Sequence, residues 1–331
     1  MLLRIFKGSG PGVIFLIAVT CVAVWLGAFF HHAAVSATIN DSGRMPLYEL
    51  LLKVVGPNAR LQATISLLLV AVMAFLLVNF NTTSFFINER TYLPALIYVL
   101  AGGLFPEYES LNPAIPASLF LMLAVVRIVD GYRKPGVANN FFDAGILIST
   151  GSLFYASLIW FGVLVIIGII LIRTVSVSEI LISVFGLLTP YLLTFAIWYV
   201  ADKDLRALVS LIRNCLFVPS EGYFFPRLTI AALTFSSIMV IVSLAFLFGN
   251  LNNKKIKSRK TFSLLIWLFL ISLTVYILMP PVSVEMIWII AIPASYFLTH
   301  YFVFKKKKLF PEIFLSLLFI LAAIIQIFYM K

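Results

Sequence analysis

Charged residues are scarce in this chain, and acidic residues are the scarcest. Among 331 residues, 13 are Asp or Glu and 24 are Lys or Arg, so charged residues make up 11%, against roughly 25% in soluble domains. Hydrophobic residues make up 62% and the mean hydropathy is +1.09. No water-soluble core of this length needs so much apolar material. The composition therefore excludes a soluble globular protein and predicts a membrane protein with many spans.

Cysteine is nearly absent, and so are the motifs of soluble enzymes. Cys21 and Cys215 lie far apart, inside or next to apolar runs, which excludes a disulfide framework and a thiolate metal site. We expect two buried, inert thiols. The chain has no Walker loop, no GxGxxG, no HExxH and no GxSxG, which argues against ATP-driven transport by this chain alone.

What the chain does contain is a succession of apolar runs. A helix rises about 1.5 Å per residue and the bilayer core is about 30 Å thick, so a comfortable span needs about 20 residues. The run from Asp143 to Ile172 is too long for one span, and we divide it into two short helices with a turn near residues 157–160. The first run is longer than a signal-peptide core, so we expect a retained helix rather than a cleaved signal.

The sequence thus predicts an all-α transmembrane helical bundle that forms a single membrane domain over residues 1–331. The eleven expected spans lie near residues 12–33, 61–80, 91–105, 115–130, 143–157, 159–173, 180–200, 227–249, 262–279, 284–303 and 309–329. Two amphipathic surface helices are expected between them. One covers residues 46–55, with Glu49 and Lys53 four residues apart, and the other covers residues 205–217.

The distribution of charge predicts the orientation. With a cytoplasmic N-terminus, 16 of the 24 basic residues lie inside, including clusters at 254–260 and 305–308, as the positive-inside rule requires. Eight of the 13 acidic residues then lie outside. This predicts a multi-pass protein of the bacterial inner membrane with a periplasmic C-terminus. The net charge of +11 thus reflects the excess of basic residues on the cytoplasmic side, so we expect membrane lipids as partners and no nucleic acid. The lysine clusters suit anionic lipids.

Three outer carboxylates are the candidate catalytic residues. Asp41 follows the first span, and Glu107 and Glu109 close the short run 91–105. Short, interrupted spans with charges at their ends are where membrane proteins tend to place sites. If the first and third helices pack together, these groups converge at the outer face. There a carboxylate acts as a general base or holds a divalent metal. The alternative is that these carboxylates are solvated loop residues.

A second candidate group is basic. Arg206, Arg213 and Lys203, with Arg227, lie on the outer side against the topological bias, and guanidinium groups suit the phosphate or pyrophosphate of a lipid-linked substrate. The alternative is that they extend to outer-leaflet head groups. The adjacent His31 and His32 point in different directions on a helix, so we do not expect joint metal binding.

Several motifs carry a resemblance to known families. They are the segments 79–94, Asn112-Pro113, 142–155 and Gly186-Leu187-Leu188-Thr189-Pro190-Tyr191. Over nearly the whole chain they resemble an uncharacterised family of polytopic inner-membrane proteins from Bacteroidota, which brings no assigned activity.

More distantly, the plan resembles the C-type glycosyltransferase superfamily, which uses polyprenyl-phosphate sugar donors. The superfamily has an acidic first outer loop, matched here by Asp41, followed by a surface helix, matched by residues 46–55, and a second acid, matched by Glu107 or Glu109. A basic cytoplasmic turn and a helix with spaced glycines come next, and residues 127–134 and 145–151 match them. The chain departs from that superfamily because its first loop lacks the paired Asp-Glu and it has no large outer domain.

Two functions follow as hypotheses. The resemblance implies a glycosyltransferase-like enzyme that acts on a lipid-linked sugar or polyprenyl phosphate at the periplasmic face during envelope glycan assembly. The alternative is a non-catalytic membrane subunit or transporter in envelope assembly. Residues 227–329 contain few ionisable side chains inside their spans, which argues against a symmetric carrier.

Overall fold

The computed structural model describes residues 2–8, 10–30, 44–132, 138–172, 177–219 and 227–329, and these residues form helices without strands. The α-helices are α1 (Leu2–Phe6), α2 (Pro11–Phe30), α3 (Pro46–Val55), α4 (Ala59–Ser84), α5 (Leu93–Gly103), α6 (Ala114–Asp130), α7 (Ala138–Ser152), α8 (Gly162–Ile172), α9 (Val177–Val200), α10 (Leu205–Phe217), α11 (Arg227–Asn250), α12 (Ile256–Leu278), α13 (Ile287–Phe304) and α14 (Leu309–Tyr329). Short 3-10 helices are η2 (Pro106–Tyr108), η3 (Ala156–Phe161), η4 (Leu251–Asn253) and η5 (Val284–Met286).

Each of the eleven predicted spans corresponds to helix, but not every helix has the length of a span. Seven segments of the described chain are long and apolar enough to cross a membrane: α2, α4, α9, α11 with η4, α12, η5 with α13, and α14. The other four predicted spans correspond to the shorter α5, α6, α7 and η3 with α8. The structure therefore supports a multi-pass helical membrane protein with seven candidate spans, and the count of eleven stays a prediction.

The turn predicted at residues 157–160 lies earlier in the chain. Helix α7 ends at Ser152, and the backbone turns back through hydrogen bonds from Phe154 and Tyr155 to the carbonyl of Gly151. Residues 156–161 then continue as the 3-10 helix η3. The turn directly follows Ser149-Thr150-Gly151-Ser152, a cluster of small and polar residues in the otherwise apolar run.

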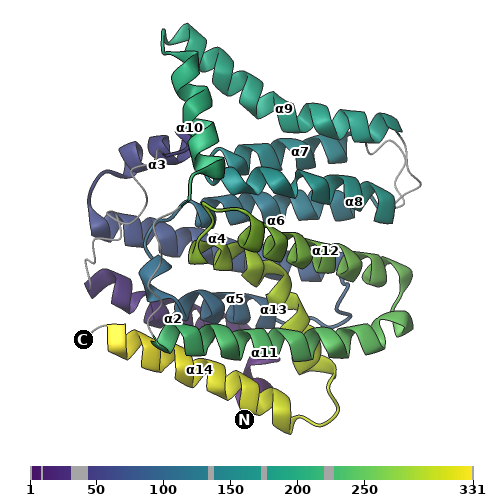
Figure 1. The fold of residues 1–331 in the computed structure, drawn as a ribbon. Coiled ribbons are helices and arrows are strands. Elements are labelled where there is room, and N and C mark those ends of the chain that lie inside the picture. Colours follow the sequence, from purple (N-terminus) through teal and green to yellow (C-terminus); the bar gives the residue numbers. More distant parts are fainter. Residues whose placement is uncertain are drawn as a thin grey trace.

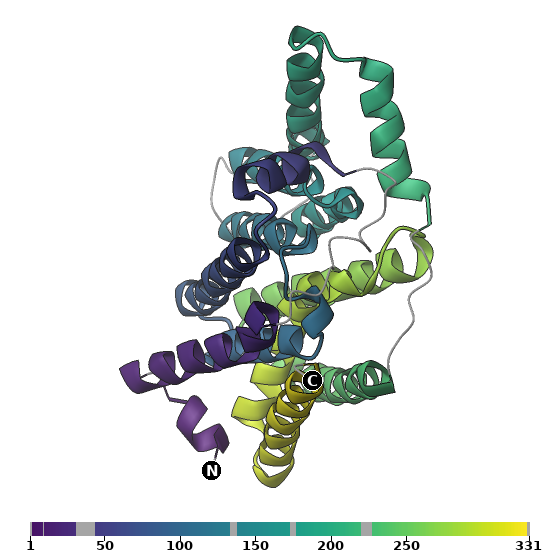
Figure 2. The ribbon, with the colours of Figure 1, turned by 90° about the vertical axis from the view of Figure 1, so that its left-hand side faces the viewer.

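Two helices form the centre of the bundle, α5 and α13 (Figures 1 and 2). In η5–α13, 83% of the most apolar window is buried, against 17–39% in the other six candidate spans. Every residue of α5 except Ala101 is buried as well. A helix that is apolar on all sides belongs in the interior. The short run 91–105 is thus a core helix that protein surrounds.

Helices α9 and α10 project from the rest of the bundle, at the top of Figures 1 and 2. Helix α9 packs closely along α7. A Cβ atom on Gly145 would lie 2.6 Å from the Ser183 carbonyl oxygen, and one on Gly186 would overlap the Phe142 carbonyl. The two backbones approach so closely because both positions lack a side chain.

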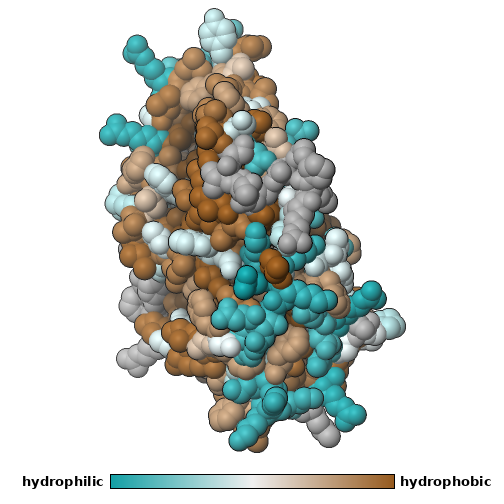
Figure 3. Space-filling view, turned by 90° about the vertical axis from the view of Figure 1, so that its right-hand side faces the viewer, coloured by the Kyte–Doolittle hydropathy of each residue, from teal (hydrophilic) through white to brown (hydrophobic). Residues whose placement is uncertain are grey.

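The two lysine clusters lie at one end of the bundle. Figure 3 looks onto this end and shows a hydrophilic patch over its lower part. The Lys254 Nζ lies 5.0 Å from the ring centroid of Phe304, which directly precedes Lys305 in the chain. We call this end the basic end and the opposite one the outer end. Placing both clusters together is what the charge count predicted; the orientation in the membrane stays a prediction.

Replacing Gly186 by Ala should lower the apparent Tm of the protein in detergent. The new methyl group meets backbone rather than a flexible side chain, and such overpacking costs about 1–3 kcal/mol. Gly249→Ala is the matched control, because a Cβ atom there has no other atom within 4 Å and Ala is the better helix former. Equal Tm values for both variants would contradict the close α7–α9 contact.

Candidate functional site

The segment between α5 and α6, residues 104–113, lies at the outer end and is fixed to several helices. Three side chains from α3, α4 and α13 donate hydrogen bonds to its backbone carbonyls: Tyr48 to Leu111 (2.9 Å), Ser66 to Glu109 (2.6 Å) and Trp288 to Tyr108 (3.2 Å). Asn112 accepts hydrogen bonds from the amides of Ala114 and Ile115 at 3.0 and 3.2 Å and so caps α6. The segment is therefore a rigid part of the bundle.

Glu109 lies in the interior. Its side chain is 0% exposed, and the Gln326 side chain of α14 donates hydrogen bonds to its Oε1 and to the carbonyl of Gly103. Burial raises the pKa of Glu109 well above its usual value, because the charged form of the carboxyl loses its hydration there. Glu109 thus joins residues 104–113 to α14. The predicted catalytic role for it stays a prediction.

Glu107 lies at the surface of the same segment. It is half-buried, and burial raises its pKa above the usual value. The expected packing of the first and third predicted spans is present, since α2 contacts both α5 and η2. Asp41, His31 and His32 lie outside the described residues, so the expected proximity of Asp41 to Glu107 stays a prediction.

The predicted phosphate clamp lies elsewhere. Arg206 and Arg213 are exposed on α10, and Lys203 precedes this helix with its Nζ 4.5 Å from the Trp198 ring centroid. Helix α10 packs on α9 and η3, whereas η2 packs on α2, α5 and α14. The structure therefore does not bring these three cations together with the carboxylates of the 104–113 segment.

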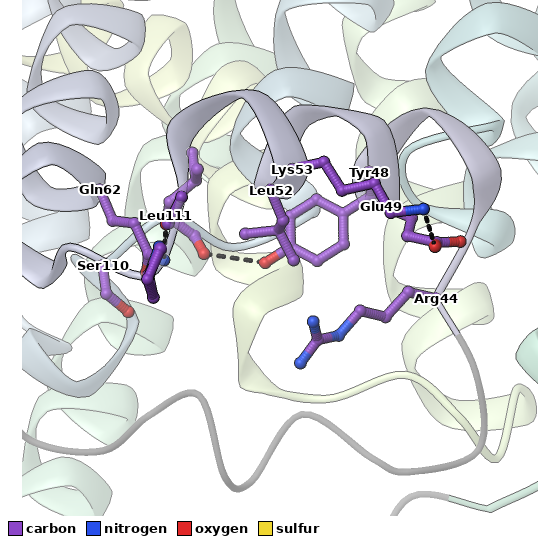
Figure 4. A pocket seen from close by; sticks show the side chains of 10 residues that line it. Arg44, Tyr48, Glu49, Leu52, Lys53, Gln62, Ser110 and Leu111 are labelled. Carbon is purple, nitrogen blue, oxygen red and sulfur yellow. Dashed lines mark hydrogen bonds and ion pairs between the residues drawn. The ribbon is translucent and has the colours of Figure 1, made fainter.

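A cavity of about 500 Å³ opens at the outer end instead (Figure 4). Helix α3, the start of α4 and two residues of the 104–113 segment line it: Arg44, Tyr48, Glu49, Leu52, Lys53, Gly56, Pro57, Gln62, Ser110 and Leu111. The Lys53 Nζ lies 2.6 Å from a Glu49 carboxylate oxygen, and the Arg44 side chain extends beside Tyr48. The lining thus carries two cations and one carboxylate.

Tyr48 connects this cavity to a buried acid. Burial raises the pKa of Tyr48, the charge of Glu285 raises it further and the charge of Arg44 lowers it. Glu285, in η5, is 9% exposed. The side chains of Arg44 and Glu285 therefore both lie close enough to this phenol to affect its pKa. The sequence analysis placed Glu285 on the outer side of the membrane but did not treat it as a candidate site residue. Its position as an acid within an apolar run was the signal that could have identified it.

Neither cysteine takes part in this site. Cys21 is buried in α2 and Cys215 is partly buried in α10, and they do not form a disulfide with each other. Burial raises the pKa of Cys215 to about 11. A thiol protonated at neutral pH is a poor nucleophile. The predicted burial is confirmed for Cys21 and only in part for Cys215, and their inertness stays a prediction.

The family of the chain is shown by comparison with known proteins. A family of unknown function, DUF6427, matches residues 47–331, so the chain belongs to this family. Neither a curated protein nor a solved structure matches it significantly.

Glu109→Gln should make the stability of the protein less dependent on pH. The folded state raises the pKa of Glu109 above the unfolded value near 4.5, so the folded protein binds more protons than the unfolded chain. The contribution of Glu109 to the stability of the folded protein is therefore complete below the unfolded pKa and is lost as pH rises towards the folded pKa. The measurement is Tm in detergent between about pH 5 and pH 8. Glu89→Gln, at an exposed position, is the control, and its Tm should depend on pH as that of the wild type does.

Proposed function

We propose that this DUF6427 protein binds the phosphate group of a lipid-linked substrate in the outer cavity and acts on that substrate as a glycosyltransferase-like enzyme. The observation that supports this is a cavity lined by Arg44 and Lys53 at one end of a bundle of candidate membrane spans. Its volume of about 500 Å³ lies in the range of small-molecule sites. Guanidinium and ammonium groups are the side chains that bind phosphate.

In this proposal Asp41 is the general base or a metal ligand, and it precedes Arg44 by three residues in the sequence. The base takes the proton of an acceptor hydroxyl, whose oxygen attacks the sugar carbon while the lipid phosphate leaves with the bonding electrons. Glu107 assists from the lip of the segment. Within the described ranges no three His, Cys, Asp or Glu side chains cluster as a metal site. In this proposal, Asp41 is the residue that would hold a divalent ion.

The remaining predicted residues take supporting positions. Glu109 fixes the segment that carries Glu107, and Arg206, Arg213 and Lys203 contact head groups or a distant phosphate of the substrate. We place these events at the periplasmic face of a bacterial inner membrane, with the N-terminus in the cytoplasm and the C-terminus outside, because the basic end then faces the cytoplasm.

A second candidate is a non-catalytic membrane subunit or transporter in envelope assembly. The observation that favours it is the separation of the α10 cations from the 104–113 carboxylates, which leaves no single cluster of all predicted catalytic groups in the described residues. Co-purification of a stable partner protein with the wild type would support the subunit.

Arg44→Gln should weaken the binding of a polyprenyl phosphate by roughly tenfold, because a charge-assisted contact to the phosphate is lost. Binding is measured by titrating the detergent-solubilised protein with the lipid. Arg90→Gln, at an exposed position on the basic end, removes the same charge and should leave the affinity unchanged. If both variants bind as the wild type does, the outer cavity is not the phosphate site.

Asp41→Asn and Glu107→Gln should abolish an envelope glycan without lowering the amount of protein. The test complements a deletion strain with each variant and compares glycan profiles by mass spectrometry. Asp130→Asn, at the opposite end of α6, is the control and should restore the wild-type profile. A deletion strain with an unchanged profile would exclude the enzyme and leave the non-catalytic subunit or transporter.

A further inference from the structure

Two loops converge at the basic end. One joins α11 to α12 and carries Lys254, and the other joins α13 to α14 and carries Lys305. The Lys254 Nζ lies 5.0 Å from the ring centroid of Phe304, which leads into the second loop. The Lys305 Nζ lies 5.3 Å from that of Phe246, near the end of α11. Each lysine thus packs on the helix that leads into the other's loop.

An imidazole lies among the same aromatic rings. His300 of α13 has its ring centroid 5.0 Å from that of Phe304, 5.4 Å from that of Phe262 and 5.6 Å from that of Phe246. The side chain is 1% exposed and its Nδ1 has no hydrogen-bond partner. Lys254 acts on it electrostatically. The two ammonium groups and this imidazole therefore share one aromatic wall.

The two loops at the basic end are rich in basic residues. The two loops and the start of α12 contain nine basic residues and no acidic one: Lys254, Lys255, Lys257, Arg259, Lys260 and Lys305–Lys308. The ion pairs of Glu49 with Lys53 and of Arg127 with Asp143 lie elsewhere in the bundle. Partial burial lowers the pKa of Lys254 to about 8, because an ammonium that loses water without gaining a counter-ion is destabilised. A bound anion would supply the missing charge.

We propose that Lys254 and Lys305 form a binding site for the phosphate group of an anionic phospholipid. The site lies at the ends of four candidate membrane spans, α11 to α14, where lipid head groups lie. Helix α12 begins at Ile256 with no acid in its first turn, so its amide groups add to the positive field. The Nζ atom of Lys254 lies over the rings of Phe262 and Phe304, and that of Lys305 lies over the ring of Phe246. This site is independent of the proposed activity at the outer end.

The test compares two variants that remove the same charge. Lys254→Gln should reduce the retention of phosphatidylglycerol by about tenfold or more, since a hydrogen-bonded charge pair is lost. Lys307→Gln, at an exposed position of the same end, should change it little. The protein is reconstituted in nanodiscs of mixed phosphatidylglycerol and phosphatidylcholine, released into detergent and examined by native mass spectrometry for bound lipid. Lys254→Arg keeps the charge and should retain the lipid, which shows that the fold tolerates a change at this position.

Three outcomes would overturn the proposal. Equal losses in Lys254→Gln and Lys307→Gln would mean a diffuse electrostatic attraction rather than a site. Retention of phosphatidylcholine equal to that of phosphatidylglycerol would mean that charge is not recognised. Displacement of the lipid by millimolar inorganic phosphate would mean that the site binds a free anion. The proposed activity at the outer end is tested separately, by the Arg44 and Asp41 variants.

Discussion

The contact between α5 and α13 is the interaction on which the rest of the structure depends. Gly102 leaves room for the Trp288 ring against the backbone of α5, and a Cβ atom there would overlap that ring. The Tyr98 hydroxyl donates a hydrogen bond to the Trp288 carbonyl at 3.2 Å. Trp288 in turn donates to the carbonyl of Tyr108. A single tryptophan therefore links the core to the outer segment.

Other helices are attached to this pair by buried polar contacts. The Tyr296 hydroxyl of α13 donates to the Leu77 carbonyl of α4 at 2.8 Å, and the hydroxyls of Tyr98 and Ser118 join α5 to α6. In an apolar environment such contacts specify which helices pair, because a polar group without a partner is costly there. The short α5 is stable because protein surrounds it and supplies these partners.

This frame places different chemistry at the two ends of the bundle. At the outer end, the 104–113 segment is held by α3, α4 and α13 and lines the cavity with Arg44 and Tyr48. At the basic end, Lys254 and Lys305 lie over aromatic rings, in loops whose sequence contains no acidic residue. The residues of both sites lie at the ends of helices that pack against the core, so their basic side chains have defined positions. In our proposals, each end thus recognises phosphate with a different set of residues.

The sequence by itself determined the class of protein and the approximate positions of its helices, except for the turn between α7 and η3. Apolar length and charge asymmetry are local properties that a window of residues reveals. It also located the two lysine clusters at one end and the helix at 46–55. It did not show that α5 is a core helix, nor that Arg206 lies apart from Glu107. Those facts depend on which helices pack together. Glu285 affects the pKa of Tyr48 only because the fold brings it close to that residue, 237 positions earlier in the chain. Contacts between residues so distant in the sequence depend on the tertiary structure, and no local pattern encodes them.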